Sequence, residues 1–420
     1  MELKRVVVTG LGSVTPLGNN VETTWNNAIN GVSGAGPITH FDASKFKTQF
    51  ACEVKEYDPS IYLDRKEMRK CDRYTLLAIG ASEEAIADSK LDFEKENCDR
   101  IGVIVSAGIG GIKTFEEEVS YYATHKEMGP KFNPFFIPKM ISDIASGLIS
   151  IRHGLRGPNY GTVSACASST HSAISAFDHI RLGKADVMVV GGAEAAITEA
   201  GVGGFNAMTA LSTRNDSPKT ASRPFSASRD GFVIGEGAAC LIFEELEHAL
   251  ARGAKIYAEV IGGGMSADAY HLTASHPDGL GAKLVMRNAL QDAGINPEEM
   301  DYINVHGTST PVGDPSEIKA IREVFGDHAY KLNISSTKSM TGHLLGAAGA
   351  LETMFCVLAI QNDIVPPTIN FTEGDEDPDI DYKLNLTFNK AQKRPVNVAL
   401  SNTFGFGGHN ACVIVKKFKK

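Results

Sequence analysis

The chain has 420 residues, of which 43% are hydrophobic and 22% charged, and its formal net charge is -9. A chain of this length can bury a large core and is expected to form two or three domains. Its negative charge argues against general binding to nucleic acid, so an acidic partner would need a local basic patch. The seven cysteines are scattered without a Cys-x-x-Cys pair, which excludes a zinc ribbon and indicates a reducing compartment, the cytoplasm. Because no long apolar run and no secretory leader is visible, we expect no membrane span.

Strand and helix patterns alternate along the first half of the chain, which predicts an α/β protein with buried strands. A further short strand is expected just before Cys166, where a helix begins. The apolar, proline-broken segment 132–138 is expected to form a loop or a cap that faces a partner. The remaining predicted elements of this half are strands over 6–9, 101–106, 187–190 and 238–243 and a helix over 75–89.

The second half repeats this order, which predicts an internal duplication with halves at 1–254 and 255–420. If a pseudo-twofold axis relates the halves, the helix that begins at Cys166 faces the helix that begins at His343, and the two side chains meet near the centre. The predicted elements here are strands over 257–261, 302–305, 332–335, 396–400 and 411–415 and helices over 282–293, 316–325 and 343–360.

A run of small residues, 161–170, contains a single cysteine, Cys166, and an apolar helical pattern follows it. Cys166 therefore lies near the first turn of a buried helix, where free backbone N–H groups and the helix dipole favour a thiolate. This position is typical of a nucleophile that accepts an acyl group. A small, inert cysteine of the core is the alternative that the pattern leaves open.

Two histidines follow strand-like segments in the second half. His306 enters a loop rich in glycine and threonine, a place where catalytic groups are common, and His343 precedes a helix of small residues. Glu352 lies inside that apolar helix, and because a buried glutamate is costly unless paired, we expect it to pair with Lys338. A histidine satisfied within a turn and a purely structural ion pair are the alternatives.

The loop 401–410 joins the last two predicted strands and contains three glycines, Gly405, Gly407 and Gly408. Glycine lets a backbone approach a ligand closely, so this loop is suited to donating N–H groups to an oxyanion. A glycine-rich hairpin without a catalytic role would have the same pattern.

Together and in this order, these motifs resemble the β-ketoacyl-acyl carrier protein synthases of the thiolase superfamily, most of all their type II enzymes. The resemblance extends over essentially the whole chain. It implies a duplicated, thiolase-like α/β fold in layers α-β-α-β-α with two mixed sheets, the cysteine in the first half and both histidines in the second. Further motifs that carry it are 9–12, 108–111, 211–215, 222–225 and 230–232.

The resemblance implies an acyltransferase of fatty acid biosynthesis. Cys166 would hold an acyl group, and a malonyl group on acyl carrier protein would lose carbon dioxide and attack it, giving a 3-oxoacyl product. His306 and His343 would promote the decarboxylation, and Lys338, supported by Glu352, would orient the site. The N–H groups of Cys166 and Phe404 would form the oxyanion hole. The implied substrate contacts are Phe404 as a gate over the cysteine, Ile109 at the acyl pocket, and Thr273, Thr308 and Thr310 along the pantetheine arm.

The implied partners are acyl- and malonyl-loaded acyl carrier protein and a second copy of the chain in a homodimer, with no metal or organic cofactor. Lys66, Arg69 and Lys70 belong to a short basic segment whose like charges are unfavourable on an isolated helix. This segment is therefore the expected docking patch for the acidic carrier, although a solvated basic face would look the same. Many relatives have an arginine where this chain has Thr209, so the docking surface differs in detail.

Three other functions share part of this pattern. A polyketide ketosynthase uses every one of these catalytic residues. A thiolase would need a second cysteine in the closing glycine loop, where this chain has Asn402, Thr403 and Phe404. A non-catalytic subunit that sets chain length would lack the nucleophile, so Cys166 argues against it.

Overall fold

The computed structural model describes residues 3–419, and nine strands form its central sheet. Their order is β4-β5-β6-β1-β7-β13-β12-β8-β9. Most of these strands are buried from end to end, as expected of sheets covered on both faces. Their bounds are β1 Val6–Val14, β4 Ile101–Ser106, β5 Val187–Glu194, β6 Gly237–Glu245, β7 Ala258–Ala267, β8 Tyr302–Asn304, β9 Asn333–Ser335, β12 Val398–Gly405 and β13 His409–Lys416.

Apart from β9, which has no counterpart, the strand order is symmetric about the β1–β7 pair, and the pairing directions match on both sides. β4–β5 and β12–β8 are parallel, whereas β5–β6, β6–β1, β7–β13 and β13–β12 are antiparallel. The two predicted mixed sheets are present as the two halves of this arrangement. They are hydrogen-bonded into one sheet because β1 and β7 pair through Val6–Val260, Val7–Glu259 and Val8–Ala258. The duplicated order of the elements agrees with the predicted internal repeat.

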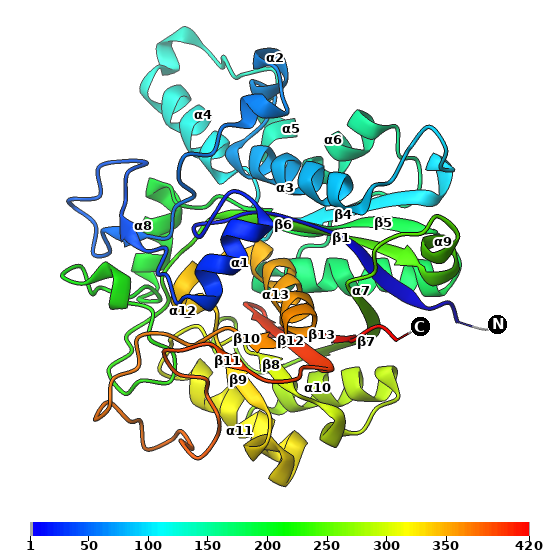
Figure 1. The fold of residues 1–420 in the computed structure, drawn as a ribbon. Helices are drawn as coiled ribbons and strands as arrows, with labels where there is room; N and C mark the ends of the chain where they lie inside the picture. The colour runs from blue at the N-terminus through cyan, green and yellow to red at the C-terminus, as the bar shows by residue number, and fades with distance from the viewer. Residues whose placement is uncertain (1–2, 420) are drawn as a thin grey trace.

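Helices cover the sheet halves and separate them, which gives the predicted α-β-α-β-α layers (Figure 1). α3 lies on the outer face of the first half and α10 and α11 on that of the second, with α7 and α13 between the halves. The helices are α1 Val21–Ile29, α2 Arg65–Met68, α3 Arg73–Ser89, α4 Ile112–Thr124, α5 Phe136–Met140, α6 Ile144–His153, α7 Ser168–Arg181, α8 Glu199–Ala207, α9 Leu246–Ala251, α10 Leu280–Ala293, α11 Gly313–Phe325, α12 Lys338–Thr341 and α13 Ala348–Asn362.

The smaller elements are short. Two-residue strands pair as β2 with β3 and as β10 with β11. Their bounds are β2 Gly36–Pro37, β3 Phe50–Ala51, β10 Ile364–Val365 and β11 Gln392–Lys393. The 3-10 turns are η1 Pro59–Ile61, η2 Cys98–Arg100, η3 Lys126–Met128, η4 Ala165–Ala167, η5 Pro218–Thr220, η6 Pro297–Glu299, η7 Gly326–Tyr330 and η8 Leu345–Ala347.

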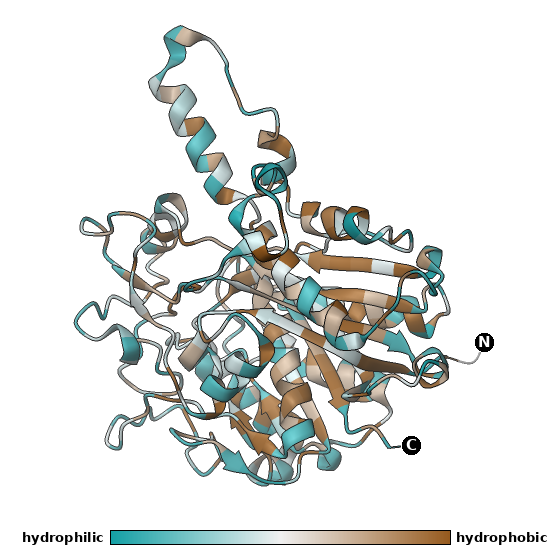
Figure 2. Cartoon of the chain, turned by 45° about the horizontal axis from the view of Figure 1, so that its top comes forward, coloured by the Kyte–Doolittle hydropathy of each residue, from teal (hydrophilic) through white to brown (hydrophobic). Residues whose placement is uncertain are grey.

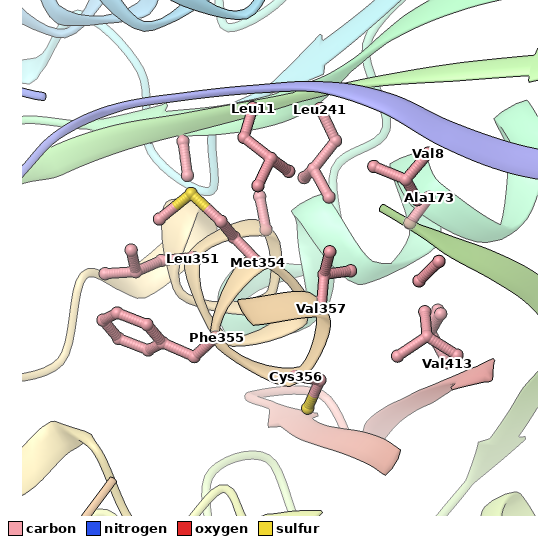
Figure 3. Packing of buried hydrophobic residues seen from close by; sticks show 14 of the residues in the cluster. Val8, Leu11, Ala173, Leu241, Leu351, Met354, Phe355, Cys356, Val357 and Val413 are labelled. Carbon is pink, nitrogen blue, oxygen red and sulfur yellow. The ribbon is translucent and has the colours of Figure 1, made fainter. Parts of the chain in front are cut away.

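The core is centred on α13, of whose 15 residues 13 are buried. Met354 and Val357 point toward the first sheet half and its Leu11 and Leu241, while Cys356 points toward the second (Figure 3). Each large apolar side chain buried this way contributes about 1.5–3 kcal/mol. The stretch Leu345–Asn362 is long and apolar enough to cross a membrane, but 89% of it is buried inside the protein.

An arm made of α4, α5 and the chain between them projects from the body (Figures 1 and 2). The predicted loop or cap at 132–138 lies in this arm, where residues from Phe136 onward form α5. Several of its apolar side chains are exposed: Phe115, Val119, Phe132, Phe135 and Ile137. The strands of the body are brown in the hydropathy view, in contrast to the mixed colours of the arm (Figure 2).

Two predicted elements differ near the site. The short strand expected before Cys166 is absent, because this segment makes only one bridge to β4, between Asn159 and Val103. The helix expected to begin at His343 begins later, since η8 and α13 start after Leu344. His343 instead runs beside Ile234 as extended chain, and its N–H donates to the carbonyl of Val233 at 2.7 Å.

Candidate active site

Cys166 is the middle residue of η4, the 3-10 turn that leads into α7. The preceding Ala165 has φ +51°, a left-handed conformation that costs an alanine roughly 1–2 kcal/mol. Ser168 holds this turn, because its hydroxyl accepts from the Ser164 N–H at 3.0 Å and donates to the Ala165 carbonyl at 2.7 Å. Strain maintained by such bonds is common at functional sites. It places the Cys166 side chain, which is 7% exposed, against a cavity.

Burial raises the pKa of the Cys166 thiol to about 12, despite the opposing effects of the Lys338 charge and of the N–H groups of Phe406 and Cys166 itself. Near pH 7 the resting group is therefore a neutral thiol. The expected preference for a thiolate at the helix start is outweighed, because removing the sulfur from water disfavours its charged form more strongly. The N–H groups nevertheless face the place where negative charge develops when the sulfur reacts.

The rings of His306 and His343 lie 5.1 Å apart and almost perpendicular, at 87°. His306 follows β8, and Glu317 of α11 holds its backbone by accepting from the His306 and Gly307 N–H groups at 3.0 and 2.9 Å. His343 is held by its backbone bonds to the segment 233–235 and lies edge-on to Phe232, with 5.4 Å between ring centroids. The backbone thus positions both imidazoles and leaves their rings for a ligand.

Both imidazoles are neutral in the folded protein. Burial lowers the pKa of His306 and of His343 well below the usual range, and the positive charge of Lys338 lowers both further. The Nδ1 atoms of both rings have no hydrogen-bond partner among residues 3–419. A neutral imidazole keeps one N–H donor, so each ring can donate a hydrogen bond to a bound substrate.

Lys338, the first residue of α12, forms a buried ion pair with Glu352 of α13, and both residues are at most 2% exposed. Burial raises the pKa of Glu352 to about 7, against the lowering effect of Lys338. The pair is the one expected from the sequence. Its positive end also acts on Cys166 and on both histidines, so it is electrostatically part of the site.

A single cavity of about 640 Å³ joins most of the predicted site residues. Lys338 and Glu352 are not among the residues that line it, and neither is the basic segment of α2. Thr308 and Thr310, whose hydroxyls are 3.1 Å apart, also line the cavity. The predicted residues that line it are Cys166, His306, His343, Phe404, Ile109, Thr273, Thr308 and Thr310.

The closing glycine loop contributes a different N–H from the one predicted. Phe404 lines the cavity and its ring lies 5.6 Å from that of His306. The backbone N–H beside the Cys166 sulfur, however, belongs to Phe406, two residues later. Phe404 is still in the β12–β13 ladder opposite Asn410, whereas Phe406 is beyond its last pair, Gly405–His409, where the backbone turns toward Cys166. The N–H that faces the sulfur is therefore that of Phe406 and not, as expected, that of Phe404.

Two buried carboxylates at the site were not identified from the sequence. Glu317 supports His306, and Glu194, at the end of β5, accepts hydrogen bonds from the loop that contains Ile109. Burial raises the pKa of each to about 7, against the effect of those N–H donors. The sequence around each glutamate contains no signal for this role. All donors to Glu194 are far from it in the chain, and the nearest donors to Glu317 are the N–H groups of residues 306 and 307.

Two family models match the chain: the N-terminal domain of beta-ketoacyl synthase over residues 3–249 and the C-terminal domain over 257–372. The chain belongs to the beta-ketoacyl synthase family. The 3-oxoacyl-[acyl-carrier-protein] synthase 2 of Coxiella burnetii is 51% identical over 418 residues, covering 99% of each chain. A relative of that name from Synechocystis is 49% identical over 420 residues, covering 100% of this chain and 99% of the relative.

Solved structures of ketosynthases have the same fold. A beta-ketoacyl synthase from Burkholderia phymatum superimposes with a TM-score of 0.91 at 34% identity, covering 99% of this chain and 100% of the other. A type II polyketide ketosynthase, solved with its acyl-carrier protein, gives a TM-score of 0.89 at 34% identity with the same coverage. The family resemblance and the layered fold predicted for this synthase are thereby confirmed.

Proposed function

We propose that this synthase is a 3-oxoacyl-[acyl-carrier-protein] synthase that elongates fatty acids by decarboxylative condensation. The observation that carries the proposal is the meeting, in one cavity, of a cysteine at a strained helix start and two neutral histidines with free rings. The relatives near 50% identity are enzymes of that name along their whole length.

In the first step, the Cys166 sulfur attacks the thioester of an acyl-carrier substrate. The bond from the carbonyl carbon to the carrier sulfur breaks, an acyl-Cys166 thioester forms, and the thiol proton leaves with the carrier thiol. The N–H groups of Cys166 and Phe406 stabilise the negative oxygen of the tetrahedral intermediate. Because burial keeps the cysteine a thiol until substrate arrives, proton loss accompanies the attack rather than preceding it.

In the second step, malonyl-carrier protein occupies the freed cavity. His306 and His343 donate hydrogen bonds to its thioester carbonyl, so that the enolate formed as carbon dioxide leaves is stabilised. The carbanion attacks the acyl-Cys166 carbonyl, a carbon–carbon bond forms and the bond from that carbonyl carbon to the Cys166 sulfur breaks. The 3-oxoacyl product departs on the carrier, and the sulfur regains a proton from water. Burial, reinforced by the charge of Lys338 paired with Glu352, keeps both imidazoles neutral, which is the state that can donate without carrying charge.

The acyl chain is assigned to the space beyond Ile109. Ile109 lines the catalytic cavity and also a second cavity of about 640 Å³. That cavity has apolar walls, suited to an alkyl chain, formed by Ile112, Phe115, Met140, Ile141 and Val163 among others. The pantetheine arm is assigned to the opposite side of the catalytic cavity, beside Thr273, Thr308 and Thr310.

Acyl carrier protein is the proposed partner, with Lys66, Arg69 and Lys70 as its docking patch. All three are exposed at or just after α2, and the Lys70 ammonium lies 5.8 Å from the ring centroid of exposed Phe135. A cationic surface beside an aromatic ring suits an acidic partner on a protein of net charge -9. The solved polyketide ketosynthase in complex with its acyl-carrier protein has the same fold.

A homodimer is proposed because the face around the second cavity exposes many apolar side chains. Exposed apolar patches beyond the ordinary size mark interfaces, and a second copy would cover both the arm and the open side of that cavity. We place the synthase in the cytoplasm, since its seven cysteines are unpaired, and the boundary of its two halves at 254/255. The exposed residues are Ile109, Phe115, Phe132, Ile137, Ile141, Ile151, Tyr160 and Val163.

The alternatives are distinguished by the site and by the products. A thiolase would need a second cysteine at the cavity, yet Cys412 faces the core of the second half and Cys166 is the cysteine that lines the cavity among residues 3–419. A polyketide ketosynthase remains the second candidate, since one is 34% identical with the same fold. If the synthase is found to extend saturated acyl groups by two carbons per cycle, fatty acid synthesis is favoured over polyketide synthesis.

Intact-mass measurement tests the proposal. Purified synthase mixed with an acyl-loaded carrier should gain the mass of one acyl group, and Cys166→Ala should abolish that gain. Cys98→Ala is the matched control. Cys98 is a free cysteine that is only partly buried, so it would react first in a non-specific acylation. An adduct that survives Cys166→Ala, or no adduct on the unmodified protein, would contradict the proposal.

A further inference from the structure

Glu194 is a fully buried carboxylate at the end of β5 that no step of the proposed reaction uses. It accepts hydrogen bonds from three successive backbone N–H groups, those of Gly108 at 2.8 Å, Ile109 at 3.2 Å and Gly110 at 3.0 Å, and from the Gly346 N–H at 3.1 Å. A buried carboxylate is costly unless its oxygens are satisfied. Here backbone donors from two distant segments do this, so the carboxylate fixes both segments.

The two segments belong to different halves of the molecule. Gly108–Gly110 follows β4 of the first half, and Gly346 is the middle residue of η8 in the second. They touch: a Cβ at Gly346 would lie 2.1 Å from the Gly108 nitrogen and 2.8 Å from the Glu194 carboxylate. Glu194 is therefore the residue that ties the loop containing Ile109 to the turn that follows His343.

The hydrogen bonds to Glu194 fix the position of Ile109. This residue lines both the catalytic cavity and the second cavity, so it is part of the wall between them. Its own N–H lies between the two oxygens of Glu194, 3.2 Å from each. Glu194 lines neither cavity and touches no reacting group. It holds the loop, and its charge also raises the pKa of Cys166, an effect that is common to all acyl chain lengths.

We propose that Glu194 is a positioning residue that holds Ile109 as the partition between the two cavities and thereby sets which acyl chain lengths the synthase accepts. This inference rests on the proposed function, in which the acyl chain passes Ile109. The malonyl group reacts at the two histidines, whose own backbone N–H groups are held by Val233 and Glu317 and not by Glu194. We therefore expect Glu194 to affect selection of the acyl group more than decarboxylation.

The test compares Glu194→Gln with the unmodified synthase. The amide keeps the volume but replaces one accepting oxygen with a donor, so the three loop N–H groups and that of Gly346 lose part of their acceptor. The rate of Cys166 acylation is measured by intact mass with short, medium and long acyl-carrier substrates. The ratio of the fastest to the slowest chain length should change about tenfold, the effect of one charge-assisted hydrogen bond. Malonyl-carrier decarboxylation should stay near that of the unmodified protein.

Glu244→Gln is the matched control. Glu244 is a fully buried carboxylate on β6 that accepts from Thr9, His248 and Arg252 and lines neither cavity. It should lose stability without any change in the ratio between chain lengths. A Glu194→Gln variant that slows every chain length and decarboxylation by one common factor would show a merely structural role and overturn the proposal, as would an unchanged ratio.

Two further measurements keep the proposal testable if Glu194→Gln folds poorly. In the unmodified protein, hydrogen exchange at the amides of residues 108–110 should be slow, because all three donate to a buried carboxylate; fast exchange would overturn the anchor. Ile109→Ala should change the chain-length ratio, and adding Glu194→Gln should have little further effect on that ratio. If the effects of the two substitutions on the chain-length ratio were fully additive, Glu194 would not act through Ile109. Failure of the proposed function itself is distinct, since the unmodified synthase would then acquire no acyl group at all.

Discussion

The helix starts of the two halves are built on the same backbone but do different work. In each half a 3-10 turn, η4 or η8, leads into a buried central helix, and its first residue has a left-handed φ, +51° for Ala165 and +48° for Leu345. The second residue is Cys166 in the first half and Gly346 in the second. The repeated turn is therefore a scaffold, and the side chain placed on it decides the chemistry.

The difference lies in what the backbone N–H groups of each turn contact. Around Cys166 they face the sulfur and the cavity, where a substrate oxygen can use them. At Gly346 the N–H is already bound to Glu194, and no side chain fits because Gly108 lies against the same spot. The N–H groups at the Cys166 turn are thus available to a substrate, whereas the N–H of Gly346 in the matching turn serves to hold the structure together. The reactive group of the second half, His343, precedes the turn instead of sitting on it.

The largest expected effect is a loss of one reaction step, decarboxylation, while the other step, acylation of Cys166, is retained. His343→Ala removes a hydrogen-bond donor to the enolate and should slow malonyl-carrier decarboxylation about 10²–10³-fold, whereas Cys166 should still acquire an acyl group. Decarboxylation is followed by release of carbon dioxide and acylation by intact mass. His328→Ala is the control, since His328 bonds the Met300 carbonyl far from the cavity. Normal decarboxylation by His343→Ala would show that the second half does not carry this step.

A smaller effect is expected where the two central helices cross. A Cβ on Gly349 of α13 would lie 1.9 Å from the Thr170 hydroxyl of α7, which Thr403 also bonds at 2.7 Å. Gly349→Ala should therefore cost about 1–3 kcal/mol of unfolding free energy through overpacking, measured by denaturant titration. Gly147→Ala is the control: it lies within α6 with open space around it and should gain roughly 0.5–1 kcal/mol. Equal stability of the two variants would mean that the halves can separate at this crossing.

Much of the fold follows from patterns along the sequence, because its strands are buried on both faces. The predicted strand 101–106 has the bounds that β4 has in the structure. β1 and β7 are longer than predicted, since their ends include glycines that pair through the backbone and contribute no apolar pattern. The link between β1 and β7 was not predicted either, because pairing at a sheet edge depends on how the halves approach each other.

The site was predictable where a side chain carries the chemistry, and not where the backbone does. Cys166, His306 and His343 belong to distinctive local motifs, and the structure brings them to one cavity. Phe404 and Phe406 have almost the same neighbours in sequence, so which N–H faces the sulfur is decided only by where the β12–β13 ladder ends. Glu194 is a single glutamate whose partners are backbone groups of distant segments, and nothing near it in the sequence indicates them.

The last expected effect appears only on acidification, and it tests whether both histidines are held neutral in the second half. In the folded protein their pKa values are well below the usual range. Below about pH 6.5 the two imidazoles therefore become protonated in the unfolded chain but stay neutral in the folded protein. Folding stability is then lost as the pH falls. Between pH 7.5 and 5.0 the unmodified synthase should lose more unfolding free energy than His306→Gln/His343→Gln, by about 2 kcal/mol for each imidazole. Between pH 7.5 and 9 the difference between the two proteins should stay constant, because the imidazoles are neutral in both states there. Equal acid sensitivity would mean that the folded site accepts protons on its histidines, and their role as neutral donors would have to be abandoned.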